Sequence, residues 1–132
     1  KYYEQFVTSY RDSEKINSSL VYPLSYIEFA QDETYLFKFL FIDDMDLNMS
    51  KTTDFYKEED NEKRANDFSE SIGIRLEKAK TIFLDLFLYS HGIAVLTATK
   101  KMKLDKDSAQ KMVINVLSIL IKQEKPDWHL EI

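Results

Sequence analysis

Few residues in this chain of 132 have the types and spacing that catalysis or metal binding requires. Neither His91 nor His129 has a glutamate three residues before it, so the Glu-x-x-His pairs of a di-metal carboxylate bundle are absent. The two glycines cannot form a glycine-rich phosphate loop, and one internal histidine with scattered serines is a weak basis for a catalytic triad. We therefore expect no enzymatic activity, no bound metal and no cofactor.

Three residues within one long apolar stretch, residues 79–98, need a physical explanation. His91 is either a satisfied core or interface residue or a hydrogen-bond donor in a pocket. Asp85 needs water, a hydrogen bond, an ion pair or a ligand, because a carboxylate in an apolar run is otherwise costly to bury. Gly92 lowers helix propensity, and the close approach of another helix is a common reason to keep such a glycine.

Large aromatic side chains are the second group of candidates. At helical spacing they usually form plain core, yet many large rings with hydroxyl groups rarely pack without gaps, and the residues alone leave core and pocket open. We expect an apolar cavity for a hydrophobic effector, aromatic or cationic, with Tyr10, Asp85 or His91 as polar anchors. The expected aromatic walls are Tyr22, Tyr26, Phe29, Phe41, Phe83 and Phe87.

The elements that must position these residues are helices. Two glycines and two prolines are too few for the turns of a sandwich or barrel, and apolar residues recur at helical spacing, so we expect one all-α domain over residues 1–132. The absence of cysteine excludes a disulfide framework and a thiolate metal site, and it fits a reducing compartment. The longest apolar run, residues 82–88, is interrupted by Asp85 and is far shorter than a membrane span, so we expect no membrane partner.

The first half of the chain predicts three helices. The first ends before a polar run at residues 11–19, where Ser18 or Ser19 caps the second helix. Pro23 fits the first turn of that helix, which ends near residue 31. Asp32 then caps a short third helix, residues 33–42, and an exposed loop follows at residues 43–53.

The second half predicts three more helices. The fourth covers residues 54–72, and Gly73 closes it in the left-handed conformation. The central helix covers residues 75–101. After Asp105 as its N-cap comes the last helix, which Pro126 ends at the latest.

The central helix is apolar on nearly every side, so it must be covered on nearly every side. One small domain covers about half of such a helix, and the last helix adds further apolar surface. We therefore expect a homodimer in which a two-fold copy forms a four-helix interface with these two helices. The expected interface residues are Leu88, Val95, Ile114, Leu117 and Ile121.

The net charge of −5 is unevenly distributed. Residues 43–70 hold ten acidic against four basic side chains, a local charge of −6, which leaves +1 for the rest. The carboxylates lack the spacing of a calcium loop, so a solvated loop and helix are the simpler interpretation. No basic face exists for nucleic acid, and we expect no direct binding of duplex DNA.

Two segments resemble the ligand-binding domain of TetR-family transcriptional regulators. Residues 26–41, YIEFAQDETYLFKFLF, are similar to the family's helix ending in YIEFA, which passes through a short polar link into LFKxxF. Residues 87–94, FLYSHGIA, are similar to its Trp-x-x-x-His-Gly signature, with Phe87 in place of the tryptophan. The resemblance extends over nearly the whole chain.

This resemblance implies a tetracycline-repressor-like C-terminal domain, whose last two helices pair with their copies and whose ligand lies among the earlier helices and the central one. It also implies that operator DNA binds only through an N-terminal helix-turn-helix domain absent from this chain. We therefore expect the effector-sensing and dimerisation domain of a cytoplasmic repressor. The alternative is a stand-alone helical small-molecule carrier or protein-interaction domain.

Overall fold

The computed structural model describes residues 2–14, 17–43 and 48–130, which form helices and no strand. This confirms the all-α prediction for that part of the chain. The α-helices are α1 (Tyr2–Glu14), α2 (Val21–Asp32), α3 (Thr34–Lys38), α4 (Glu59–Ile72), α5 (Leu76–Ala98) and α6 (Lys106–Lys122). Shorter helical turns are η1 (Ser18–Leu20), η2 (Phe39–Asp43) and η3 (Thr52–Lys57).

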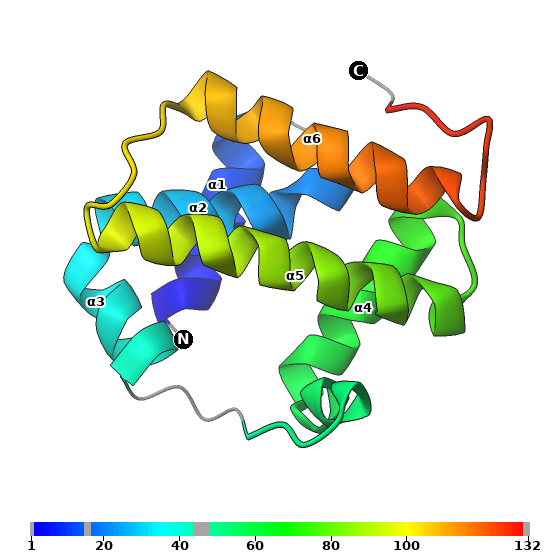
Figure 1. Ribbon diagram of the computed structural model, residues 1–132, viewed down its shortest axis with the longest axis horizontal. Helices are drawn as coiled ribbons and strands as arrows, with labels where there is room; N and C mark the ends of the chain where they lie inside the picture. Colours follow the sequence, from blue (N-terminus) through cyan, green and yellow to red (C-terminus); the bar gives the residue numbers. More distant parts are fainter. Residues whose placement is uncertain (1, 15–16, 44–47, 131–132) are drawn as a thin grey trace.

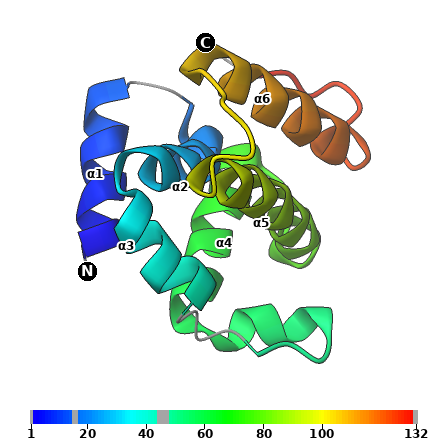
Figure 2. The same ribbon diagram turned by 60° about the vertical axis from the view of Figure 1, so that its left-hand side comes forward.

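Helix α5 lies at the centre of the arrangement, with α2 along it and α6 packed against both (Figure 1). Figure 2 shows α2 between α1 and α5, while α4 crosses α5 on a further side. Helix α6 turns Ala109, Val113, Leu117 and Ile121 into the core, at a spacing of four residues that makes one continuous apolar stripe. The rings of α1, α2 and α3 form a second core cluster around Phe29 and Phe37.

Two predicted helix boundaries are confirmed by their capping geometry. Gly73 has a φ of 69°, the left-handed conformation that a residue without Cβ adopts at little cost, and it closes α4. The Asp105 side chain accepts a 2.7 Å hydrogen bond from the Ser108 backbone N–H and caps α6. Both positions follow from local backbone chemistry alone.

Two other predicted caps are wrong. Asn17, rather than Ser18 or Ser19, begins the η1 turn, because its side chain accepts a 2.9 Å hydrogen bond from the Ser19 backbone N–H. Asp32 is the last residue of α2 and does not cap α3, which follows Glu33 without a side-chain cap. The η1 turn therefore precedes α2, and a bend at Glu33 precedes α3, where the sequence predicted helices that begin directly at a capping side chain.

The remaining boundaries also differ. Helix α1 continues to Glu14, into the predicted polar run, of which residues 15–16 lie outside the described ranges. The predicted loop likewise includes residues 44–47, which are not described. The η3 turn begins at the end of this predicted loop. There the Asp54 carboxylate accepts hydrogen bonds from the backbone N–H groups of Ser50 and Lys51 at 2.9 and 3.1 Å. Helix α4 therefore begins at Glu59, later than predicted.

Helix α5 ends three residues earlier than predicted. Lys100 adopts a φ of 62°, and the Lys101 N–H donates a 2.8 Å hydrogen bond to the Leu96 carbonyl, the closing bond of a left-handed helix end. Among the described residues, α5 is the helix long and apolar enough to span a membrane, with a mean hydropathy of 1.5. Such a helix was not expected from the sequence, because the apolar run at residues 82–88 is far shorter than a membrane span. A core helix also meets the criterion, and α5 packs against α2, α4 and α6.

Candidate functional site

A small, partly open cavity of about 70 Å³ lies where α1, α2, α4 and α5 meet η2. Aromatic rings make most of its wall. Its lining residues are Tyr3, Tyr22, Pro23, Tyr26, Phe41, Asn61, Arg64, Phe83, Leu86, Phe87 and Ser90. A volume of this size holds a few water molecules, whereas pockets for drug-sized ligands are about 300–1,000 Å³.

Most of the expected aromatic residues line this cavity. Five of the six do so, namely Tyr22, Tyr26, Phe41, Phe83 and Phe87. Phe29 does not, because it is fully buried between the rings of Tyr3 and Phe6, at centroid distances of 5.2 and 5.1 Å. Phe29 therefore supports the cavity wall from behind.

The expected polar anchors lie elsewhere. Tyr10 is buried in the core and does not line the cavity. Asp85 is exposed and lines a separate surface hollow beside Tyr56. The exposed position satisfies its carboxylate with water, so Asp85 is not a ligand residue of this cavity.

His91 lies behind the cavity wall and holds one of its rings. Its Nδ1 is 2.7 Å from the Tyr26 hydroxyl, and its ring stacks on Phe87 at a centroid distance of 5.6 Å. Burial lowers the pKa of His91, which favours the neutral imidazole. Burial also raises the pKa of Tyr26, so its hydroxyl keeps its proton. His91 therefore positions Tyr26 and Phe87 without lining the cavity.

Arg64 on α4 was not among the predicted site residues, yet it is the charged side chain of the lining. Its guanidinium carbon lies 5.4 Å from the ring centre of Tyr3 and 5.6 Å from that of Tyr22. Arg64 therefore already covers the faces of two rings, and its positive charge disfavours a cationic ligand beside them, so that expectation stays a prediction without support from this geometry. One feature of the sequence could have indicated Arg64 as a site residue. Arg64 stands four residues before the buried Phe68, so the two side chains lie on neighbouring turns of the same face of α4.

Two more lining residues carry polar groups that the sequence did not indicate. Ser90 on α5 is 1% exposed, and its Oγ has no hydrogen-bond partner among the described residues. The Asn61 side-chain amide, in contrast, donates a 3.0 Å hydrogen bond to the Phe55 carbonyl. A buried hydroxyl without a partner is costly, so Ser90 is the polar group of this cavity that a ligand or water can satisfy.

The η2 segment places Phe41 in the cavity wall. This segment is a single π-helical turn, a rare conformation that often occurs at functional sites. Phe41 packs edge-to-face against Tyr3 and Tyr26, both at a centroid distance of 5.1 Å. The wider turn thus brings a ring from the end of α3 toward α1 and α2.

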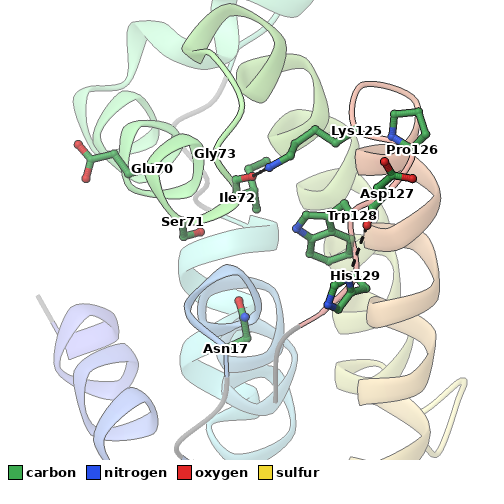
Figure 3. Close-up of a pocket in the computed structure, with 10 residues that line it drawn as sticks. All are labelled: Asn17, Glu70, Ser71, Ile72, Gly73, Lys125, Pro126, Asp127, Trp128 and His129. Carbon is green, nitrogen blue, oxygen red and sulfur yellow. Dashed lines mark hydrogen bonds between the residues drawn. The ribbon is translucent and has the colours of Figure 1, made fainter.

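A larger hollow, about 620 Å³, lies between the end of α4 and residues 125–129. Figure 3 shows Lys125 reaching to the Ile72 carbonyl, to which its Nζ donates a 3.2 Å hydrogen bond. The hollow is open to solvent, and the side chains of Glu70, Asp127 and His129 on its rim are exposed. The Lys125 hydrogen bond across it attaches the C-terminal segment to α4, so the less open, mostly apolar aromatic cavity is the better candidate site.

An exposed apolar face is the second candidate surface. Leu88 and Leu96 on α5 are 54% and 45% exposed, and Ile119 on α6 is 56% exposed. Leu88, Gly92 and Leu96 recur every four residues and therefore share one face of α5. A Cβ added at Gly92 would meet nothing within 4 Å, so no helix of the described chain makes a close approach there.

Part of the predicted dimer surface is corrected by the fold. Leu117 and Ile121 are fully buried in the core of their own chain, because they belong to the stripe of α6 that faces inward. Val95 and Ile114 are partly buried, and Leu88 is exposed. Ile119, which was not among the predicted interface residues, is the large apolar residue of α6 that is exposed.

Comparison with known proteins assigns no family to this chain: no protein-family model, no curated protein and no solved structure matches it. Within the described ranges, no three His, Cys, Asp or Glu side chains lie close enough together to hold a metal ion. The candidate site is therefore defined by its geometry, as an aromatic cavity with one guanidinium and one unsatisfied hydroxyl.

Proposed function

We propose that this chain is the effector-sensing and dimerisation domain of a TetR-type transcriptional regulator in the cytoplasm. The observation that carries the proposal is the contact between the two segments that resemble this family. The Tyr26 hydroxyl of the first segment lies 2.7 Å from the His91 Nδ1 of the second, and Tyr26 and Phe87 line the same cavity. A buried aromatic cavity with few polar groups suits a hydrophobic small molecule.

The small volume implies that the effector must move the wall of the cavity. About 70 Å³ is below what a drug-sized ligand needs, so binding requires side chains or helices to shift. Tyr3 of α1 is one of the lining residues. In the proposed regulator, α1 follows the helix-turn-helix domain, and a shift of α1 would carry the effector signal to operator DNA.

We further propose that the exposed face of α5 and α6 is the dimer interface. Exposed Leu88 and Leu96 flank Gly92, where the free space permits a second helix to approach closely. Ile119 adds apolar surface on α6. A two-fold copy would cover these residues in an isologous four-helix arrangement.

Analytical ultracentrifugation at micromolar concentration tests the dimer. We expect the wild-type chain to sediment as a dimer and Leu88→Glu to sediment as a monomer, because two carboxylates would face each other near the two-fold axis. Tyr35→Glu is the matched control, since it introduces the same charge at a 90% exposed residue on α3 and should leave the dimer intact. A wild-type monomer would contradict the proposal.

A thermal-shift screen of small aromatic compounds tests the sensor role. Compounds that raise the melting temperature of the wild-type chain should do so less in Phe87→Ala, which removes one ring of the wall. Ligand binding by a chain that stays monomeric would instead favour the stand-alone carrier.

A further inference from the structure

We propose that the cavity binds a small apolar carboxylic acid whose carboxylate replaces Glu4 as the partner of Arg64. This inference rests on the proposed function, because it names the effector class of the same cavity. It goes beyond a general hydrophobic effector by committing to an anion.

The charge of the lining selects an anion. Arg64 is the charged residue among those that line the cavity, and its side chain is only 18% exposed. Its guanidinium lies over the rings of Tyr3 and Tyr22, so it faces the same space as the aromatic walls. A planar guanidinium in such a place binds a carboxylate through two parallel hydrogen bonds, and it repels an amine.

In the structure, Glu4 of α1 supplies the counter-charge of Arg64. Its carboxylate forms an ion pair with Arg64 and is 52% exposed. Returning an exposed carboxylate to water costs little, since exposed ion pairs contribute little to stability. A ligand carboxylate is the same chemical group as the one it displaces, so Arg64 keeps its charge balance throughout the exchange.

The rest of the cavity suits the remainder of such an acid. Phe41, Phe83 and Phe87 offer an apolar surface for a single ring or a short alkyl chain. The unpartnered Ser90 Oγ can donate to a second acceptor or hold a water molecule. Glu4 and Tyr3 are neighbours on α1, so release of Glu4 loosens the same turn that must move to enlarge the cavity.

Isothermal titration calorimetry of the full chain tests this, with benzoate, phenylacetate and hexanoate as probes and their amides as neutral counterparts. We expect at least one acid to bind about tenfold or more tightly than its amide, the range for a hydrogen bond to a charged group. Arg64→Met should abolish that preference. Glu4→Gln should tighten acid binding about two- to fivefold, because it removes the competing carboxylate, and should leave amide binding unchanged.

Glu62→Gln is the matched control, since Glu62 pairs with Lys80 at 2.6 Å and does not line the cavity. It should leave both affinities unchanged. Circular dichroism checks that each variant is folded, and Glu4→Gln changes an exposed side chain.

The outcomes separate this inference from the proposed function. Equal binding of acid and amide, or weaker acid binding by Glu4→Gln, would overturn the carboxylate class. Tighter binding of an amide or amine than of the corresponding acid by a dimeric chain would overturn it too, while the sensor role remained. A monomeric chain that binds none of the probes would overturn both.

Discussion

At the scale of single residues, the site depends on which polar groups are satisfied. The Tyr26 hydroxyl has the His91 ring, and Arg64 has Glu4, whereas the Ser90 hydroxyl has no partner in the described chain. The satisfied groups hold rings and helices in place. In the proposed site, the Ser90 hydroxyl and Arg64, whose partner Glu4 is half exposed, are the groups that a ligand would contact.

His91 gives the stability of the chain a pH dependence. Because burial lowers the pKa of His91, the unfolded chain takes up a proton that the folded chain resists as the pH falls below the ordinary value of about 6.5. The free energy of unfolding should therefore be highest above that pH and decrease until the pH reaches the lower pKa of the folded state. Urea denaturation between about pH 7.5 and 5.5 measures this.

The variant His91→Asn isolates this effect, since it keeps an acceptor for the Tyr26 hydroxyl and cannot be protonated in this range. Its stability should change less with pH over the same interval. Equal slopes for the wild type and the variant would show that another group is responsible.

At the scale of elements, helix ends decide how the helices meet. Gly73 turns the chain from α4 into α5 with a left-handed backbone, and the Lys125 Nζ bonds to the Ile72 carbonyl just before it. This cation at the negative end of α4 also attaches the segment after α6 to that helix. One turn therefore links three parts of the fold.

Gly73→Ala should lower the free energy of unfolding by about 1–2 kcal/mol, because a Cβ is strained in the left-handed conformation. The added Cβ would also lie 3.2 Å from the Lys125 Nζ and crowd its bond to Ile72. Gly73→Asn should lose less, since asparagine tolerates this conformation better. Chemical denaturation of both variants provides the comparison, and an Ala variant as stable as the wild type would contradict the cap.

At the scale of the whole molecule, charge and apolar surface are distributed unequally. The acidic stretch at residues 43–70, with its local charge of −6, covers η3 and α4, while the exposed leucines lie on α5. The acidic part favours contact with water, and in the proposed dimer a second copy would cover the apolar face. The excess of acidic charge argues against direct binding of nucleic acid.

We therefore expect this chain alone not to bind duplex DNA at moderate salt. A net charge of −5 offers no footprint for phosphate groups, and repulsion opposes even nonspecific binding. A mobility-shift assay with mixed-sequence duplexes checks this. Sub-micromolar binding of duplex DNA by this chain would contradict the proposal that a separate domain of the regulator binds operator DNA.

The sequence by itself determined the features that depend on neighbouring residues. The helices follow from apolar periodicity, and Gly73 and Asp105 mark real helix ends because capping needs only local backbone groups. The sequence also indicated that Tyr26, Phe41 and Phe87 come together, because large rings on the buried faces of adjacent helices converge, but it left open whether they form a cavity wall or plain core.

Only the tertiary structure decided which of these faces meet. Periodicity marks the apolar stripe of α6 but not what covers it, so Leu117 and Ile121 were assigned to a second subunit when their own chain buries them. Arg64 and Ser90 enter the cavity because α4 crosses α5 at one particular turn. That crossing is set by packing between residues far apart in the chain, which local spacing cannot encode.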